Sequence, residues 1–415
     1  MSKHSSERVF FGWKVVFTAF AIATFTWGVG FYGLSVFLDE LHHIHGWSVS
    51  IISAAITTHF VLSAIAVAYL DEAHHRFGIG WVTGVGVIAT CAGILCWSLV
   101  IAPWQMFGAA VLTGVGWAAT SGAAINAIVS PWFIRRRPIA LGLALNGSSA
   151  GGVIFTPLWV FLIAKIGLFA ATCLVCVTML LALLPLIKGH LFATPESTGT
   201  APDGESDVSR RELPTSPPRP TIPLSSLLRD RRFVTLSAAF ALGLFAQVAV
   251  VIHLVARLKE VFGLEQAAGA VSLVTVCAVI SRLLLGSLMG NADRRLVGLG
   301  NFALKAAGII CLAVGTDASM LLIGCVMFGF GMGNLLLLAP LIAQKEFPPS
   351  DVRRVVALVT SGNQALFAFG PVIFGILSSV YRGYEVPFLI AASIEILAGA
   401  ILLIGRTRQP TWEAA

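Results

Sequence analysis

Charge is what this sequence has least of. Only 11% of its 415 residues are Asp, Glu, Lys or Arg, whereas 57% are hydrophobic and the mean hydropathy is +0.88. Charged residues normally make up about 25% of a soluble globular domain. The composition therefore excludes the soluble classes and predicts a chain embedded in a membrane.

Other absences narrow the class further. The seven cysteines all lie in apolar stretches, which predicts core packing and no disulfide framework. No glycine-rich loop ends in Lys-Ser or Lys-Thr, so nothing supports ATP-driven transport. Catalytic side chains do not cluster at one depth, so we expect neither an enzyme nor a cofactor. The trio His42, His43 and His45 suggests a metal, but adjacent loop positions do not converge without help, and we expect no metal site.

Twelve apolar stretches are each long enough to cross about 30 Å of hydrocarbon. A polar segment rich in Pro, Ser and Thr follows the sixth stretch and is typical of a disordered linker. The sequence thus predicts an all-α membrane protein with twelve transmembrane helices in two six-helix halves, residues 1–192 and 231–415, joined by a linker at 193–230. The predicted spans cover roughly 12–38, 48–70, 79–101, 104–129, 138–163, 168–188, 232–256, 265–289, 296–316, 318–343, 354–380 and 385–405.

The distribution of Lys and Arg predicts the orientation of these spans. Most of the 27 cationic residues fall between spans on one side, whereas Lys165, Arg257, Lys259 and Arg382 fall on the other. Cations accumulate on the cytoplasmic side of membrane proteins. We therefore expect a multi-pass protein of the cell inner (plasma) membrane, with both termini and the linker in the cytoplasm. The lipid bilayer is the expected surrounding. The cations lie in loops and not on an aromatic-interleaved surface, so no nucleic-acid partner is expected.

The stretch after Arg135, Arg136 and Arg137 is dense in small residues. Gly142, Gly147, Gly151 and Gly152 leave one face of the predicted helix 138–163 nearly bare. A bare face lets another helix approach closely, which is a common means of helix association in membranes. We therefore expect close helix packing along this stretch.

The two halves repeat each other. An offset of about 217 residues relates several positions, as parallel six-helix repeats would. The matching positions are Arg136 with Arg353, Arg137 with Arg354, Ala140 with Ala357, Leu141 with Leu358 and Asn146 with Asn363; Leu70 and Arg76 match Leu288 and Arg294 at nearly the same offset.

Over its whole length the chain resembles the major facilitator superfamily. That family carries a Gly-x-Leu-x-Asp-Arg-x-Gly-Arg-Arg loop after the second span of each half. Here residues 286–295 read GSLMGNADRR, and the first-half copy has Ala68 at the glycine position and Glu72 at the acidic position. The resemblance implies the fold of that family, and the residues expected at its gating loops are Glu72, Arg76, Arg136, Arg137, Asp293 and Arg294.

Within the superfamily, the chain is similar to the monocarboxylate-porter-like branch. The matching motifs are GWKVV at 12–16, YGLSVF at 32–37, GWS at 46–48, and Trp132-Phe133 followed by an arginine pair. Arg282 stands four residues before the loop glycine, where that branch places an arginine associated with the substrate carboxylate. The chain differs from this branch at two positions. It has Tyr32 where animal members have a lysine, and Ala278 where the branch has an acidic residue.

The resemblance implies a secondary active transporter of a small organic anion, a carboxylate moved with protons. One half would rock against the other around a midplane cavity, and the protein would be a monomer. Two alternatives stay open. One is proton-driven efflux of a hydrophobic compound, and the other is a membrane sensor that binds a ligand without transporting it.

Arg282 is the main candidate for substrate binding. A buried guanidinium matches a carboxylate in two hydrogen bonds, although it could instead snorkel to the rim or close a gate. Uncharged polar residues on spans that line the cavity of the resembled fold are further candidates, and each could alternatively bond a neighbouring helix. They are Tyr32, Asn126, Asn146, Gln247, Asn334 and Asn363.

Three residues are candidates for coupling. Lys305 and Glu395 lie near mid-depth on spans that neighbour each other in the resembled fold, and we predict that they form a structural ion pair. Proton coupling through Glu395 is the alternative. His59 could titrate and take part in coupling, or it could be a neutral imidazole bonded to a hydroxyl. His253, near the outer end of span seven, is expected at the membrane interface.

Overall fold

The computed structural model describes residues 10–406 except 196, 205–221 and 289–291. Throughout these residues the regular structure is helical, with no strand. Twelve helices in the described part are long and apolar enough to cross a membrane, six before the linker and six after it. The predicted fold class is confirmed.

The first half contains six spans, of which the first and fourth are assembled from several helical segments. The segments α1, η1 and α2 run on as one span, and α6, α7 and η2 form another. The bounds are α1 Phe11–Trp27, η1 Gly28–Tyr32, α2 Gly33–His45, α3 Val49–Ala68, α4 Leu70–Phe77, α5 Ile79–Ser98, α6 Pro103–Ala118, α7 Gly122–Val129, η2 Ser130–Trp132, α8 Arg137–Ile166 and α9 Leu168–His190.

The second half follows two short segments of the linker region. The short segments are η3 Pro202–Gly204 and α10 Leu224–Leu227, and α15 and α16 together form the eleventh span. The bounds of the spans are α11 Arg231–Phe262, α12 Leu264–Leu288, α13 Arg294–Val314, α14 Ala318–Glu346, α15 Pro349–Phe367, α16 Gly370–Tyr381 and α17 Glu385–Ile404.

Some expected loops are helical. The loop expected from Asp39 onward is the end of α2, which continues to His45 and stops at Gly46, where φ is +66°. A left-handed glycine is the usual end of a helix, because it has no Cβ to clash. The segment that carries Glu72 is the short helix α4. The expected disorder of the linker falls mostly on residues 205–221, which lie outside the described residues.

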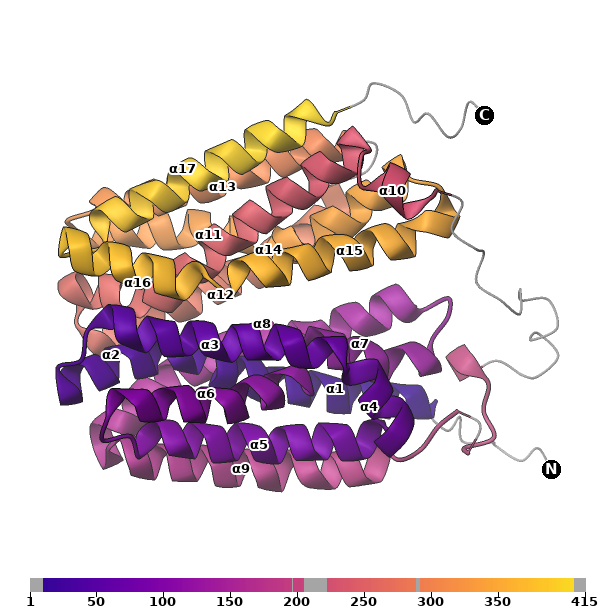
Figure 1. Ribbon diagram of the computed structural model, residues 1–415, viewed down its shortest axis with the longest axis horizontal. Coiled ribbons are helices and arrows are strands. Elements are labelled where there is room, and N and C mark those ends of the chain that lie inside the picture. Colours follow the sequence, from indigo (N-terminus) through magenta and orange to yellow (C-terminus); the bar gives the residue numbers. More distant parts are fainter. Residues whose placement is uncertain (1–9, 196, 205–221, 289–291, 407–415) are drawn as a thin grey trace, which may run out of the picture.

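The halves lie side by side, with α3, α2 and α8 of the first facing α16, α11 and α12 of the second (Figure 1). We call the end that carries α4, α10 and the loop Arg135–Arg137 the basic end, and the end that carries Gly46 and Gly263 the far end. The first and last described residues, Phe10 and Arg406, both lie at the basic end, since Phe10 packs on Trp132 and Arg406 contacts Asp293.

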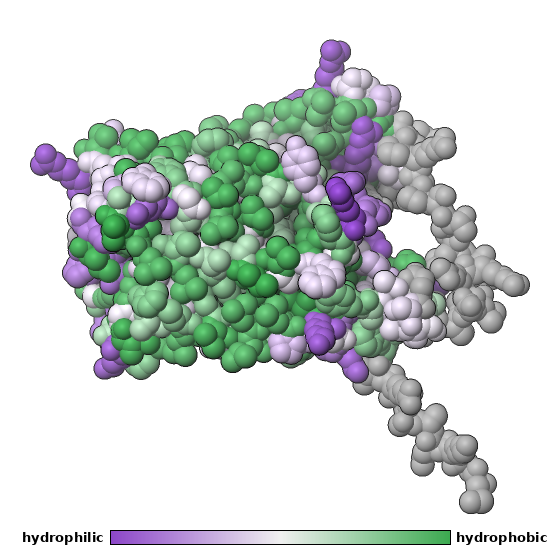
Figure 2. All heavy atoms as spheres, turned by 60° about the horizontal axis from the view of Figure 1, so that its bottom comes forward, coloured by the Kyte–Doolittle hydropathy of each residue, from purple (hydrophilic) through white to green (hydrophobic). Residues whose placement is uncertain are grey.

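The surface between the two ends is apolar (Figure 2). Large hydrophobic side chains are exposed there, among them Trp104, Leu181 and Leu283 at 72%, 71% and 66% exposure. A soluble protein rarely exposes so continuous an apolar surface, but a bilayer solvates it well. The protein is a multi-pass membrane protein.

Glycines bring helix backbones together in both halves. A Cβ on Gly147 of α8 would lie 2.2 Å from the carbonyl oxygen of Phe20 in α1, and one on Gly333 of α14 would lie 2.1 Å from that of Ala278 in α12. The predicted close packing of the helix after the arginine triplet is confirmed at Gly147. Gly142, in contrast, has open space beside it.

Candidate functional site

Arg282 joins the two halves of the molecule. It lies near the basic end of α12, which packs against α8 of the first half. Its Nε donates to the carbonyl oxygen of Gly333 in α14 (3.0 Å), and its Nη1 donates to Asn146 Oδ1 (3.0 Å) and to Ser149 Oγ (3.4 Å) of α8. One guanidinium is therefore held by the second half and reaches into the first.

The partners of Arg282 are all neutral. The three most deeply buried cations, Arg257, Arg295 and Lys305, each contact a glutamate, at 2.9, 2.6 and 2.8 Å. Among the residues that the structure describes, Arg282 has no such carboxylate. A guanidinium in a low-dielectric setting with only neutral acceptors keeps a strong attraction for an anion. This arrangement can bind a carboxylate across the boundary between the halves.

Tyr32 lies on the same boundary. It ends the π-helical turn η1, which interrupts the first span. A Cβ on Gly152 would lie 2.6 Å from Tyr32 Cζ and 2.5 Å from Thr275 Cγ2, so the phenol ring packs where α8 meets α12. Thr275 is about two helical turns along α12 from Arg282. Single π turns are frequent at functional sites, and the sequence analysis did not predict this one.

An aromatic cluster lies in the first half. Its members are Trp27, Phe31, Phe60 and Trp117, together with Phe367 of α15. Phe31 stacks on Trp117 with ring centroids 6.2 Å apart, and Phe60 contacts Phe367 at 5.6 Å. The contact with Phe367 extends this cluster into the second half.

His59 is buried beside the aromatic cluster. Its Nδ1 lies 2.9 Å from Thr113 Oγ1, and its ring packs edge-on against Phe60 at 4.8 Å. Its Nε2 has no hydrogen-bond partner within the described part of the chain. The expected bond to a hydroxyl is present, and the role of His59 in coupling stays a prediction.

Lys305 and Glu395 form the predicted ion pair. Lys305 Nζ lies 2.8 Å from Glu395 Oε1, and both side chains are completely buried. Nζ also lies 3.2 Å from Gln247 Oε1 and 3.3 Å from the carbonyl oxygen of Gly243. A Cβ on Gly331 would lie 2.0 Å from Lys305 Cγ, so this glycine leaves room for the lysine. Gln247, a candidate for substrate binding, accepts a hydrogen bond from the lysine, which is the alternative of a bond to a neighbouring helix.

The remaining predicted polar residues have separate surroundings. Asn334 Nδ2 donates to Ser281 Oγ (2.6 Å) and Asn301 Oδ1 (3.2 Å), which links three helices of the second half. Asn126 is exposed on α7 and accepts from Ser130, and Asn363 is buried on α15. Of the predicted set, Asn146 is the one that the structure joins to Arg282 by a hydrogen bond in the described chain.

The loops of the first half at the basic end are held by backbone contacts. Glu72 and Arg76 are exposed on α4. Arg137 donates to the carbonyl oxygens of Phe133 and Ser130, at 2.9 and 3.0 Å. The backbone N–H of Arg136 donates to Asp203 of the linker (3.2 Å), whose other oxygen accepts from the N–H groups of residues 134 and 135. The linker therefore docks at the start of α8.

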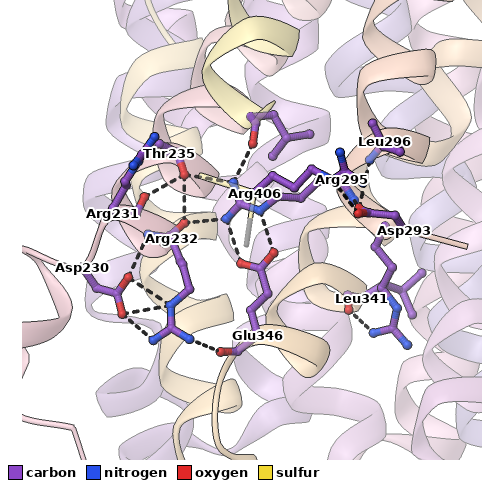
Figure 3. A network of polar contacts seen from close by, with 12 residues as sticks. Asp230, Arg231, Arg232, Thr235, Asp293, Arg295, Leu296, Leu341, Glu346 and Arg406 are labelled. Atoms are coloured by element: carbon purple, nitrogen blue, oxygen red, sulfur yellow. Dashed lines mark hydrogen bonds and ion pairs between the residues drawn. The ribbon is translucent and has the colours of Figure 1, made fainter. Parts of the chain in front are cut away.

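The loop of the second half contains a denser charge network (Figure 3). Asp293 caps α13 by accepting from the N–H of Arg295 and contacts Arg406 at 2.7 Å, while Arg294 donates to the carbonyl oxygen of Leu341. Burial alone would raise the pKa of Asp293, but the hydrogen bonds from Arg406 and from the backbone hold this pKa below its ordinary value.

Arg295 and Glu346 form the centre of this network, and the sequence analysis did not single them out. Nε and Nη2 of Arg295 contact the two oxygens of Glu346, at 2.6 and 2.8 Å, and Nη1 donates to Thr235 Oγ1 (2.9 Å) (Figure 3). Arg295 is only 2% exposed. A glutamate in the last turn of an apolar span indicates that a cation must lie beside it. The sequence alone does not identify which cation that is.

Two further features appear toward the far end. Lys259 of α11 forms an ion pair with Asp39 of α2, so a charge contact joins the two halves there. The sequence analysis had placed both residues in outer loops. The expected interfacial position of His253 is wrong, because this side chain is completely buried and its Nε2 lies 3.2 Å from the carbonyl oxygen of Pro371.

The Major Facilitator Superfamily matches residues 16–355 and 270–415 of the chain. This chain belongs to the Major Facilitator Superfamily. It is 25% identical to mouse monocarboxylate transporter 4 over 428 residues (96% of this chain, 85% of that protein) and 27% identical to rat monocarboxylate transporter 3 over 424 residues (95% and 79%). A crystal structure of a mutant of the nucleoside transporter NupG has a TM-score of 0.74 at 11% identity, covering 96% of this chain and 100% of that one.

Membership of this superfamily has direct consequences for function. Its members among these relatives are transporters and not enzymes, so the chain is a membrane transporter with a small-molecule substrate. The resemblance stated from the sequence is confirmed, including the similarity to monocarboxylate transporters. The likeness to NupG concerns the fold alone.

Proposed function

We propose that this protein is a secondary active transporter of a small organic carboxylate, which it binds at Arg282 and moves together with protons. The observation that carries the proposal is a guanidinium that bridges the halves and has only neutral partners in the described chain. The planar fork of an arginine donates two parallel hydrogen bonds to a carboxylate. The similarity to monocarboxylate transporters supports the same substrate class.

Transport would proceed by alternating access of two halves, residues 1–192 and 231–415, joined by the linker 193–230. A substrate carboxylate would replace Asn146 and Ser149 as acceptors for Arg282 Nη1. The substrate would then take the place of a direct contact between the halves, so substrate binding would change how the halves move relative to each other. The cation distribution supports a cytoplasmic basic end, with both termini in the cytoplasm and the helices crossing the cell inner membrane. The protein would act as a monomer.

The proton is assigned to His59 in this proposal. Its Nε2 has no partner in the described chain, and its ring contacts the aromatic cluster that reaches Phe367 of the other half. Glu395 is held by Lys305 inside the second half, which supports a structural role for that pair. We expect His59→Gln to transport substrate down its own gradient but to lose acceleration by an inward proton gradient.

The test is uptake of labelled lactate, pyruvate and oxalate into proteoliposomes, with and without an inward proton gradient. We expect saturable uptake that the gradient accelerates. Arg282→Ala should lower kcat/KM by about 100-fold or more, since a charge-assisted pair is lost. Arg282→Lys should recover only part of it, because an ammonium lacks the planar fork. Lys165→Ala, an exposed cation in the last turn of α8, is the matched control.

Two outcomes would contradict the proposal in different ways. Full uptake by Arg282→Ala would remove this residue from the substrate site but leave carboxylate transport standing. Absence of uptake of any acid by correctly folded protein would remove the substrate class. If ligand binding persisted without any flux, the sensor alternative would apply.

A second candidate function is proton-driven efflux of a hydrophobic compound. The aromatic cluster favours it, because its five large rings form an apolar contact between the two halves, which could open toward a hydrophobic compound when the halves move. Everted vesicles with a lipophilic fluorescent dye added outside would test it. Proton-dependent dye accumulation that Trp117→Ala abolishes and Arg282→Ala leaves intact would favour efflux over carboxylate transport.

A further inference from the structure

A recess lies at the basic end, away from the boundary between the halves. It has a volume of about 390 Å³ and is lined by Trp13, Lys14, Phe17 and His190. The first three belong to the first two turns of α1, and His190 is the last residue of α9. The recess therefore lies where two membrane spans end, at the depth at which lipid headgroups meet the protein.

The polar atoms of this recess are basic. Lys14 is exposed, and its ammonium lies 5.7 Å from the centroid of the Phe11 ring. His190 Nδ1 lies 2.8 Å from Thr18 Oγ1. Thr18 Oγ1 donates to the carbonyl oxygen of Lys14 (3.0 Å), so His190 Nδ1 is the donor to Thr18, and the imidazolium form of His190 can donate to an anion through Nε2. Among the residues that the structure describes, no carboxylate lines the recess, and Lys14 gives it a positive charge.

The remaining wall of the recess is apolar and continues onto the surface between the two ends. Phe17, one turn further into the span, is 59% exposed. Trp13 is held by Phe133, with ring centroids 4.9 Å apart. Tryptophan and lysine at the end of a span are the residues that meet the polar part of a bilayer, and phenylalanine meets the acyl chains. The cationic part of the recess thus lies where the phosphate of a phospholipid would be, and the apolar part lies where its acyl chains begin.

We propose that this recess binds the headgroup of an anionic phospholipid from the leaflet at the basic end. Lys14 Nζ and His190 Nε2 would hold the phosphate, and the first carbons of an acyl chain would lie along Phe17. Basic recesses between spans are known to select anionic headgroups. The proposal does not depend on the transported substrate. It defines a lipid site on the lipid-facing surface of the first half.

Lipid retention and thermal stability of the purified full chain in detergent would test this proposal. Native mass spectrometry should show one phosphatidylglycerol retained per chain, with at least tenfold weaker retention of phosphatidylcholine. Phosphatidylglycerol should also raise the unfolding midpoint, whereas glycerol 3-phosphate should not, because it lacks the acyl chains that contact Phe17.

Variants separate this site from general attraction of anionic lipid to a basic surface. Lys14→Gln together with His190→Gln should weaken phosphatidylglycerol retention about tenfold or more, while Lys188→Gln should leave it unchanged. Lys188 is an exposed cation in the same last turn of α9 but does not line the recess. Equal losses in both variants, equal retention of the two lipids, or equal stabilisation by glycerol 3-phosphate would each overturn the proposal. Phe17→Ser, with both cations intact, should weaken retention to a smaller degree, and no effect would contradict the acyl-chain contact.

Discussion

Glycine contacts and neutral hydrogen bonds occur inside both halves, whereas the buried ion pairs of the described chain lie inside the second half. In the first half, α1 and α8 meet at Gly147, and His59 bonds Thr113. In the second half, Lys305 contacts Glu395 and Arg295 contacts Glu346. Repeats with matching sequence positions and one architecture are therefore stabilised by different interactions.

The difference shows where charge is tolerated in this fold. A buried ion pair gains little net stability over apolar packing, because both ions lose hydration, yet removing one partner is costly. Such pairs restrict which helices can be neighbours. In the second half the buried cations Arg257, Arg295 and Lys305 each contact a glutamate, whereas the half-buried Arg282 has only neutral partners in the described chain.

The largest expected effect comes from breaking the buried pair of the second half. Lys305→Ala leaves Glu395 unpaired between α13 and α17, and should cost about 3–5 kcal/mol of stability. The measurement is the unfolding midpoint in detergent. The double variant Lys305→Met with Glu395→Leu should recover most of the loss, since neither charge then remains. A single variant as stable as the wild type would show that the pair does not hold the second half together.

The corresponding change in the first half replaces a glycine. Gly147→Val would place side-chain atoms against the carbonyl oxygen of Phe20, which α1 cannot move cheaply, and should cost about 1–3 kcal/mol. Gly142→Ala on the same helix is the matched control. Open space surrounds Gly142, so this change should be neutral or should stabilise the helix by up to about 1 kcal/mol. Similar losses in both variants would argue that helix propensity, and not the contact with α1, is decisive.

A smaller effect is expected from a neutral hydrogen bond. Thr113→Val removes the hydroxyl that bonds His59 Nδ1 and should cost about 0.6 kcal/mol, the average for hydrogen bonds between membrane helices. Thr178→Val serves as control, because that exposed hydroxyl bonds only its own helix at Leu174 in the described chain. The comparison of the halves would weaken if Thr113→Val cost as much as Lys305→Ala.

The smallest effect concerns pH. The folded-state pKa of Asp293 lies below its ordinary value of about 3.9, so its ionised form stabilises the folded state above that pH and the contribution is lost as pH falls through the folded pKa. Because Asp293 and Arg406 are 33% and 40% exposed, the contribution should stay below about 1 kcal/mol. The difference in unfolding midpoint between wild type and Asp293→Asn should be constant down to about pH 4 and shrink as the pH falls further through the folded pKa.

Asp71→Asn provides the matching experiment in the first half. Asp71 is 95% exposed on α4, and His75, its ion-pair partner, is 3.9 Å away. We expect this variant to follow the wild type at every pH. A pH-dependent difference as large as that of Asp293→Asn would show that the loops of the two halves are equally structured by charge.

The sequence by itself determined the class of the protein. Twelve apolar stretches, scarce charge and the polar linker are local properties, because the bilayer requires every span to satisfy its own backbone within the span. The same holds for the bare face around Gly147 and for the motifs that identify the superfamily. Arg282 was found in this way, since a cation within an apolar stretch is conspicuous wherever its partners lie.

Apart from Lys305 and Glu395, whose pairing the family resemblance predicted, only the tertiary structure decided which side chains meet. Asn146 and Arg282, Glu346 and Arg295, and Asp39 and Lys259 are partners far apart in the sequence. In hydrocarbon, all helices are apolar, so hydropathy does not distinguish one neighbour from another. The same reason separates Gln247 and Asn334 from Arg282: an amide on an apolar span bonds whichever polar group packing brings to it. The burial of His253 was likewise decided by the tertiary structure. The position of a residue along a span does not indicate whether its side chain faces the core or the lipid.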